Sequence, residues 1–494
     1  MGIVIRQSLK GTVVIYVAVV VGTVNNIWVM PKYLPPEYIG VVRALVEYAF
    51  LFAAFAHLGI PFIANKFFSE FRQENLQHRG FFAYMLLYPL LGLGLCLGLY
   101  VLLKDWITGF YELKSPILVN YYYFVIPLTI FLTYQVVLET YSHLHLRIVV
   151  PNILRELLVK IGNLVMVLGF GWGFYQLTGL VWATVVLYAL PVIFLFFYLA
   201  WLQRLYLKPQ WQYFSWEKTK TMGIYGLYTI LGGIGVVIVS KVDAIMIPSL
   251  LGEKMMGIFT IPYFISLVIE VPKKALKQIS TPILAHALHT QDRVLMYNIY
   301  QKTSLHLFLV GSFIFLGIWL NIDDVLGIIP NEIYKQGKYV VLFLGLAKVI
   351  DMATGLNGEL LLFSSHYRFV LVLTIFLGII TIVSNYFFIS FYGLNGAGLA
   401  NLTCIVAYEL IKSVYVWYYF KIHPFTYQTL YVLGVSLFVF TLVSFMPLPL
   451  QGIVAIFMRS VLISLLFVGL TILLHISPEV NMQLSKIFSF FSKK

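Results

Sequence analysis

Charged residues are scarce in this chain, and their scarcity excludes most soluble proteins. Asp, Glu, Lys and Arg make up 11% of the 494 residues, whereas soluble globular domains contain about 25%. Hydrophobic residues make up 61%, and the mean hydropathy is +0.90. The composition therefore indicates an integral membrane protein.

Catalytic and metal-binding motifs are also lacking. The only two cysteines, Cys96 and Cys404, lie in apolar stretches of different halves, so we expect small core residues rather than a disulfide. The sequence has no G-x-x-x-x-G-K-[ST] phosphate loop, no Cys/His cluster with metal spacing and no arguable Ser/His/Asp set. We therefore expect no enzyme activity, no metal and no tightly held cofactor.

Large loops are missing as well. The longest segments between apolar stretches are residues 204–220 and 272–302. Membrane polymerases, ligases and glycosyltransferases need sizeable extramembrane loops to hold sugars and catalytic groups. The short loops therefore disfavour these enzymes.

What the chain has instead is a series of about fourteen continuous apolar stretches. Most are about 18–25 residues long, the length with which a helix spans the hydrocarbon core of a bilayer. We predict membrane-spanning helices over residues 11–30, 41–63, 80–103, 118–140, 154–174, 179–203, 221–247, 255–271, 303–322, 339–363, 369–391, 396–420, 427–446 and 453–475.

The distribution of lysine and arginine predicts the orientation of these helices. With the amino terminus in the cytoplasm, 23 basic residues fall in inner segments or toward the inner ends of spans, and four fall deeper within spans. The outer segments carry only Lys32, Lys104, Lys114, Lys254, Lys335 and Lys338. Because cytoplasmic loops carry the excess of Lys and Arg, both termini are predicted to be cytoplasmic. The net charge of +13 then reflects topology and requires no nucleic-acid partner.

The second half of the chain repeats landmarks of the first half at one offset. The residue numbers differ by 217 between Pro31 and Pro248, Leu34 and Leu251, Gly40 and Gly257, Leu177 and Leu394, Gly179 and Gly396, and Ala183 and Ala400. A fixed offset indicates a duplicated unit of six helices, and internal duplication is typical of secondary transporters.

The repeat defines the expected fold class and domains. We predict an all-α membrane protein with two six-helix lobes related by a parallel repeat, since an even number of spans gives both halves the same orientation. The lobes would be residues 1–204 and 221–420, joined by a cytoplasmic linker at 205–220. Residues 421–494 would form helices thirteen and fourteen and a cytoplasmic tail.

Several short motifs resemble a known family. Residues 6–11 (RQSLKG), 33–40 (YLPPEYIG) and 58–60 (LGI) resemble the start of bacterial polysaccharide-biosynthesis flippases of the O-antigen type. Residues 241–248 (KVDAIMIP), 256–257 and 272–274 (PKK) are similar to the second half of these proteins. The superfamily also contains multidrug and toxin extruders (MATE) and lipid II flippases. Drug extruders usually have twelve helices, so the fourteen predicted here favour the flippase branches.

The resemblance implies a function, partners and a location. The family moves undecaprenyl-diphosphate-linked oligosaccharides from the inner to the outer leaflet of the bacterial inner membrane by alternating access, with basic groups lining a central cavity. Its partners would be the lipid-linked oligosaccharide, membrane lipids and the polysaccharide polymerase and glycosyltransferases of the same pathway. A cation-coupled multidrug exporter and a lipid II-type flippase remain alternatives.

Charged residues within the spans are the candidate functional groups, because each costs about 2.5–3.5 kcal/mol at the centre of a bilayer. Arg43 and Glu47 are four residues apart and favour an ion pair within one helix. Lys348 and Asp351, three apart, allow the same interpretation.

Lys241 and Asp243 are different, because residues two apart on a helix point in nearly opposite directions. We expect one of them to face a cavity or a partner on another helix. Asp243 matches Asn26 under the offset of 217, which places polar groups at the same depth in both lobes. Arg459 lies outside the duplicated core, where anchoring to lipid or to a neighbouring helix is the favoured role.

These residues give three predicted groups. Candidate substrate-binding residues, which would attract a diphosphate, are Lys241, Lys348, Arg43 and Arg459. Candidate sites for a coupling H⁺ or Na⁺ are Asp243, Asp351 and Glu47, and candidate polar cavity residues are Asn26 and Asn357. Acidic groups in an apolar cavity would also suit a drug exporter, so both interpretations stay open.

Overall fold

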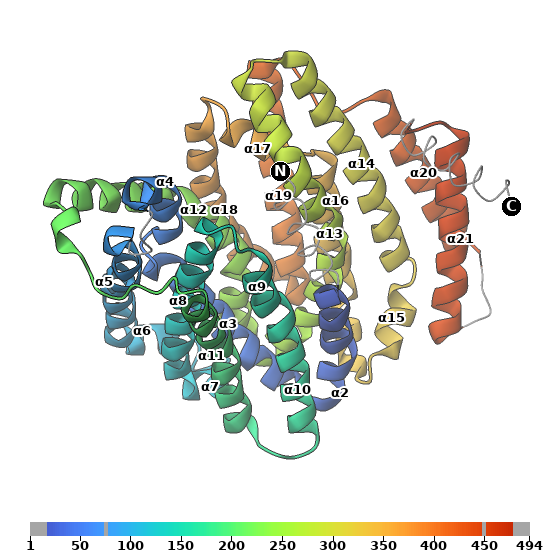
Figure 1. The fold of residues 1–494 in the computed structure, drawn as a ribbon. Coiled ribbons are helices and arrows are strands. Elements are labelled where there is room, and N and C mark those ends of the chain that lie inside the picture. The colour runs from blue at the N-terminus through green and yellow to red at the C-terminus, as the bar shows by residue number, and fades with distance from the viewer. Residues whose placement is uncertain (1–16, 74–77, 447–450, 478–494) are drawn as a thin grey trace, which may run out of the picture. The chain divides into compact units, whose positions relative to one another are not determined.

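The computed structural model describes residues 17–73, 78–446 and 451–477, and these residues form only helices and connecting segments (Figure 1). Internal contacts divide the chain into two compact units. Unit 1 contains residues 1–260 and 374–394, and unit 2 contains residues 261–373 and 395–494. These units reflect packing rather than duplication, so the lobe boundaries expected from the sequence stay a prediction.

The helices of unit 1 follow one another with short connections. In chain order they are residues 17–24, η1 (Asn25–Val29), α2 (Met30–Tyr33), α3 (Pro36–Ala56), α4 (Ile60–Phe71), η2 (His78–Gly80), α5 (Phe81–Leu102), α6 (Lys104–Gly109), α7 (Pro116–Asn120), η3 (Tyr122–Phe124), α8 (Val125–Leu144), α9 (Val149–Asn152), η4 (Ile153–Leu158), α10 (Val159–Gly171), α11 (Leu177–Trp201), η5 (Trp211–Tyr213), α12 (Trp216–Leu251), the start of α13 (Glu253–His289) and most of α18 (Tyr367–Tyr392).

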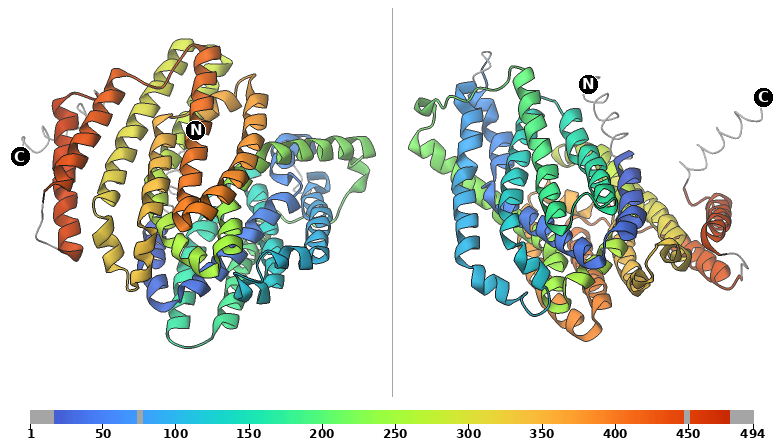
Figure 2. Two further views of the ribbon diagram at one scale, coloured as in Figure 1. Left: turned by 180° about the vertical axis from the view of Figure 1, so that it is seen from behind. Right: turned by 90° about the horizontal axis from the view of Figure 1, so that it is seen from below.

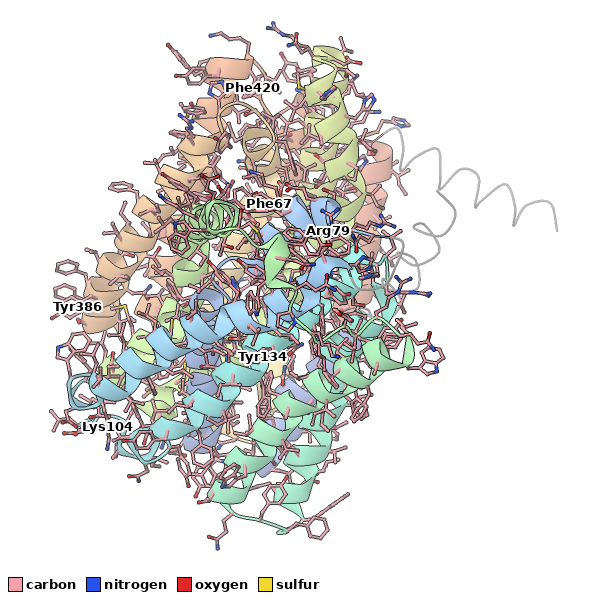
Figure 3. All side chains as sticks on the ribbon, turned by 60° about the vertical axis from the view of Figure 1, so that its left-hand side comes forward. Phe67, Arg79, Lys104, Tyr134, Tyr386 and Phe420 are labelled. Atoms are coloured by element: carbon pink, nitrogen blue, oxygen red, sulfur yellow. The ribbon has the colours of Figure 1, made fainter. Side chains whose placement is uncertain are left out.

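Helix α3 lies at the centre of unit 1, where it packs against α5, α8 and α12. Figure 3 shows α5 running from near Arg79 at one end to near Lys104 at the other. These two residues are predicted to lie on opposite sides of the membrane. Between them α5 exposes Leu91, Leu95 and Leu102, as expected of a helix that faces lipid.

Unit 2 contains the remaining helices. They are the rest of α13, α14 (Arg293–Trp319), α15 (Ile322–Ile328), η6 (Glu332–Gly337), α16 (Lys338–Ala353), α17 (Asn357–Leu362), α19 (Leu394–Phe420), α20 (Tyr427–Ser444) and α21 (Gly452–Leu473). Helix α14 packs against α16 and α20, and α21 packs against α15 and α20. The two views in Figure 2 show α20 and α21 as a pair beside α14 and α15.

Ten helices in the described part of the chain are long and apolar enough to cross a membrane. They correspond to ten of the fourteen predicted spans, so the all-helical membrane fold is confirmed. The count of fourteen stays a prediction. The predicted first span begins in residues that the structure does not describe. The predicted tail beyond residue 477 lies outside the described residues.

The other three predicted spans coincide with irregular or unusually long helices. The π-helical segment η4 covers the beginning of the span predicted at 154–174. Gly355, with a left-handed φ of +66°, separates α16 from α17 within the span predicted at 339–363. The span at 221–247 lies within α12, which is 36 residues long.

Several helix boundaries follow the offset of 217. Helix α3 begins at Pro36 and α13 at Glu253, while α11 begins at Leu177 and α19 at Leu394. The first turns of α3 and α13 also cross very closely. A Cβ on Gly40 would lie 1.8 Å from the carbonyl oxygen of Glu253, and a Cβ on Gly257 would lie 1.8 Å from that of Pro36. Each contact maps onto the other under the offset, so only glycine fits at both positions.

Candidate functional site

The first charged cluster joins α3 to α12 within unit 1; we call Arg43, Glu47 and Lys241 the α3–α12 cluster. Arg43 Nη2 lies 2.6 Å from Glu47 Oε1, and Lys241 forms an ion pair with Glu47 Oε2. The pair within α3 is therefore confirmed, as is a partner for Lys241 on another helix. Glu47 is only 5% exposed, whereas the Arg43 and Lys241 side chains are 19% and 22% exposed.

An aromatic ring lies against the lysine of this cluster. The Lys241 ammonium lies 4.8 Å from the centre of the Phe50 ring, which packs edge-on against Tyr188. Two cations and one carboxylate give the cluster a net charge of +1. Because the carboxylate is buried and the cations are partly exposed, the accessible part of the cluster is mostly cationic, and low-dielectric surroundings strengthen its attraction for an anion.

Asp243 lies on the same helix as Lys241 but in a different environment. It is 7% exposed and lies near the Asn385 side chain on α18, whose amide donates to the Thr381 carbonyl oxygen at 3.1 Å. Its Oδ1 atom has no hydrogen-bond partner among the described residues. Lys241 and Asp243 thus use separate partners, in agreement with their spacing.

The predicted polar residue Asn26 lies in the π-helical segment η1 and is half-buried. Its neighbour Asn25 makes the contact between helices: the Asn25 amide, 1% exposed, donates to Asn163 Oδ1 on α10 at 3.0 Å. The extra residue in a π-helical turn shifts side chains around the helix axis. Adjacent helical residues also point about 100° apart, so the two asparagines face different surroundings.

A second charged cluster joins α13 to α16 within unit 2; we call Glu270, Lys273, Lys348 and Asp351 the α13–α16 cluster. Lys348 Nζ lies 2.6 Å from Glu270 Oε2, and Lys273 Nζ lies 2.8 Å from Asp351 Oδ1. The ion pair within α16 that the sequence allowed, Lys348 with Asp351, is not the one formed. The two helices carry opposite charge orders at the same spacing, so pairing between helices satisfies all four groups.

The polar contacts continue toward the far ends of α13 and α19. Lys277 pairs with Glu359 on α17. Glu409, 1% exposed, lies 2.5 Å from Lys412 and accepts hydrogen bonds from Asn357 Nδ2 at 2.8 Å and Thr354 Oγ1 at 2.6 Å. The predicted cavity residue Asn357 is itself buried, with 2% exposure, and it holds this carboxylate.

Arg459 on α21 contacts a neighbouring helix, as favoured from the sequence. Its Nη1 atom lies 2.8 Å from Asp324 Oδ2 on α15 and donates to the Leu320 carbonyl oxygen and to Asn321 Oδ1. The described residues contain no group of three His, Cys, Asp or Glu side chains that could hold a metal ion.

Sequence reasoning missed Glu47 as the partner of Lys241, because 194 residues separate them. It also missed the pairing of α13 with α16, for which a signal exists. The motifs Glu-x-x-Lys at 270–273 and Lys-x-x-Asp at 348–351 are complementary, and both ion pairs have the same separation of 78 residues. Equal separations require parallel helices, and spans eight and ten of the prediction run in the same direction.

The comparisons with known proteins agree with this architecture. The family model described as "Polysaccharide biosynthesis protein" matches residues 8–273. No curated protein matches the sequence significantly. A structure of the lipid II flippase MurJ in an inward closed conformation superposes with a TM-score of 0.75 at 12% identity, covering 94% of this chain and 99% of that one.

Two transporters of the MOP superfamily also resemble this fold. An inward-facing multidrug resistance MATE transporter gives a TM-score of 0.61 at 15% identity, covering 82% of this chain and 95% of its own. A Pyrococcus furiosus transporter, whose binding pocket is described as having reverse polarity, gives 0.52 at 15% identity, with 85% and 96% covered. At these identities the similarity establishes a MurJ- and MATE-like fold.

Proposed function

Because the chain belongs to the polysaccharide biosynthesis protein family of membrane transporters, we propose that it is a flippase for a lipid-linked oligosaccharide. Its substrate would be an undecaprenyl-diphosphate-linked unit of O-antigen, capsule or exopolysaccharide, moved from the inner to the outer leaflet of the bacterial inner membrane. The observation that carries this proposal is the cationic surplus of the α3–α12 cluster, where Arg43 and Lys241 share one buried carboxylate.

A diphosphate headgroup needs such a cluster. An unpaired charge cannot enter hydrocarbon without a large desolvation cost, so a carrier must offer compensating charge along the way. Arg43 and Lys241 would supply charge-assisted hydrogen bonds to phosphate oxygens. Lys348 would act similarly from unit 2, where it shares Glu270 with the exposed Lys274, 3.9 Å away.

Alternating access would use the duplicated architecture. Two six-helix lobes, 1–204 and 221–420, would reorient about the linker at 205–220, while helices thirteen and fourteen remain outside the repeat. The helix starts that differ by 217, at Pro36 and Glu253 and at Leu177 and Leu394, support this arrangement. A pathway polymerase and glycosyltransferases would be its functional partners.

Coupling to an ion would use the acidic groups. With a negative interior, export of an anionic headgroup is favoured by about 2.3 kcal/mol per charge per 100 mV. Asp243, Asp351 and Glu47 are the proposed sites for a coupling H⁺ or Na⁺. Asp243 fits this role best, since its carboxylate is buried, lies near the neutral Asn385 side chain and forms no ion pair with the described residues.

The test is a double substitution of the two lysines. Lys241→Gln with Lys348→Gln should abolish surface polysaccharide in the producing strain and lipid-linked oligosaccharide flipping in proteoliposomes. The protein level in the membrane should stay unchanged. Lys254→Gln with Lys335→Gln is the matched control, because it removes the same charge from half-exposed surface pairs. Normal polysaccharide in the first variant would refute the proposed anion site.

A cation-coupled exporter of small amphipathic molecules is the second candidate, and the buried Asp243–Asn385 contact favours it. This function predicts that Asp243→Asn changes dye efflux and leaves polysaccharide intact. The flippase predicts the opposite result for the same variant. A lipid II-type flippase would instead rescue cells depleted of their own lipid II flippase.

A further inference from the structure

One end of unit 2 contains a cavity that the proposed transport step does not use; we call it the α15–α21 pocket. Its volume is about 420 Å³, which falls in the range of roughly 300–1,000 Å³ typical of small-molecule sites. It is lined by Trp319, Leu320, Ile322, Asp323, Asp324, Lys338, Phe440, Val443, Ser444, Met446 and Arg459. Most of the surface that it offers is polar, which makes an acyl chain a poor occupant.

Two ion pairs form the polar wall of the α15–α21 pocket. Lys338 Nζ lies 2.7 and 2.8 Å from the two carboxylate oxygens of Asp323. Arg459 Nη1 lies 2.8 Å from Asp324 Oδ2, while Asp324 Oδ1 accepts the backbone N–H of Gly452 at 2.9 Å. The four ionised groups have no net charge, so the pocket does not select an anion such as a diphosphate.

These groups keep unused hydrogen-bonding capacity. Arg459 directs all its hydrogen bonds through Nη1, and no described residue accepts from its Nη2 or Nε. Asp323 is exposed, with 76% of its side chain accessible, and each of its oxygens has lone pairs left beside Lys338. The wall therefore offers both donors and acceptors without breaking either ion pair.

An aromatic ring completes the site. Trp319 lines the pocket, and its ring centre lies 5.7 Å from Lys338 Nζ. An aromatic face packs well against a flat apolar surface, and the indole N–H adds one donor. The lining also contains the apolar Leu320, Phe440 and Val443, which with Trp319 are suited to the C–H face of a ring.

We propose that the α15–α21 pocket binds a neutral sugar ring. Each hydroxyl of a sugar donates and accepts, so vicinal hydroxyls can bridge a carboxylate and its paired cation while leaving the pair intact. A zwitterionic lipid headgroup could use the same donors and acceptors, but it lacks the C–H face that Trp319 and the apolar lining residues would cover. Under the proposed function, on which the identity of the sugar rests, the ligand is part of the exported oligosaccharide, and the pocket lies at the outer end of the spans.

The experiment uses the full-length protein in lipid nanodiscs and two water-soluble probes. One is the oligosaccharide repeat unit, released from the strain's lipid-linked intermediate by mild acid and dephosphorylated. The other is inorganic pyrophosphate. Saturation-transfer NMR and calorimetry would measure the binding of each probe to the wild-type chain and to the variants.

Trp319→Leu should weaken oligosaccharide binding about tenfold, whereas Trp319→Phe should retain most of it. Asp323→Asn with Lys338→Gln, a change at the protein surface, should weaken it similarly. Pyrophosphate binding should stay unchanged in all three. Trp172→Leu is the control, because this tryptophan is 67% exposed and lies outside the pocket. Equal oligosaccharide affinity of wild type and Trp319→Leu would overturn the sugar site.

The two proposals fail separately in this design. The variant Lys241→Gln with Lys348→Gln tests the transport site, where pyrophosphate binding should be lost. It changes no residue of the α15–α21 pocket. A wild-type chain that binds pyrophosphate but no oligosaccharide would retain the flippase proposal and refute the pocket. A third result would be phosphatidylethanolamine that co-purifies with the wild-type chain and is lost from Asp323→Asn with Lys338→Gln. This result would refute sugar binding at the α15–α21 pocket, because a lipid headgroup would then occupy it.

Discussion

Glu47 determines the charge of the α3–α12 cluster at the level of single residues. It neutralises one of two cations and is itself almost entirely buried. A buried carboxylate that pairs with both cations orients them. This arrangement suits a group that binds an anion and then releases it, because the resident carboxylate limits the affinity.

The substitution Glu47→Gln tests this role. Arg43 and Lys241 would lose their counter-charge, so we expect stability to fall by about 1–3 kcal/mol. Added pyrophosphate should restore the melting temperature of the variant more than it raises that of wild type, because the two cations then bind the anion. Thermal unfolding across a pyrophosphate series measures both effects.

Glu139→Gln is the matched control for this experiment. Glu139 is also buried and pairs with Arg155 at 3.0 Å, but Arg155 keeps a second partner, Glu156. Pyrophosphate should therefore have the same small effect on this variant as on wild type. An equal gain in both variants would contradict a specific anion site at the α3–α12 cluster.

At the level of helices, the α13–α16 cluster joins two parallel elements through reciprocal charges. Lys273 with Asp351 is the pair to test, since its side chains are only 14% and 25% exposed. In a double-mutant cycle of Lys273→Met and Asp351→Asn, the double variant should lose less stability than the two single variants together. We expect a coupling energy of about 0.5–3 kcal/mol from thermal unfolding.

The surface pair Lys335 and Glu332 provides the comparison for this cycle. Its 2.7 Å contact is as short as that of Lys273 and Asp351, but both side chains are exposed. Exposed pairs contribute little because water screens them. Similar coupling energies in both cycles would mean that water reaches the α13–α16 cluster more than its burial indicates.

Helix α12 poses a different question, because it is too long to cross a membrane along its whole length. Its 36 residues extend about 54 Å as an α-helix, against about 30 Å of hydrocarbon. Its first turns, bright green in Figure 1, run crosswise to α5 within unit 1. One face packs on α4, while Trp216, Ile224, Leu227 and Tyr228 are exposed at helical spacing with Lys220 among them.

We predict that residues 216–231 lie at the inner membrane surface. Nitroxide labels on Ile224→Cys and Tyr228→Cys in a cysteine-free chain should report burial of about 5–10 Å below the headgroups. A label at Lys220 should report a shallower position. Labels at all three positions in bulk water would contradict an interfacial helix.

At the level of the whole molecule, hydrophobicity predicted the all-helical membrane fold, and the offset of 217 predicted a transporter. The family came from the resemblance of motifs such as residues 33–40 and 241–248. The starts of α3 at Pro36 and of α13 at Glu253 also differ by 217, so the repeat extends to helix boundaries. The contacts of Glu47 and Asp243 could not be predicted, because each partner lies on a distant helix and its rotational position depends on tertiary packing. The sequence shows a glycine at position 355, but it does not show that the helix breaks there.

The crossing of α3 and α13 is expected to matter for the entire transport cycle. Gly40→Ala or Gly257→Ala would place a methyl group 1.8 Å from a backbone oxygen, so the crossing must open. We expect loss of flipping in proteoliposomes with normal insertion into the membrane. Gly98→Ala, on α5 with nothing within 4 Å, should behave as wild type. Full activity of both first variants would show that the crossing is dispensable.

The same crossing has an evolutionary consequence. Its two contacts exchange positions under the offset of 217, which is the defining property of an isologous interface between identical subunits. A half-length ancestor could have formed this contact as a homodimer through one glycine on each copy. Fusion of two such copies would have preserved the interface. Each glycine could then have been substituted independently, but Gly40 and Gly257 are both still glycine in this chain.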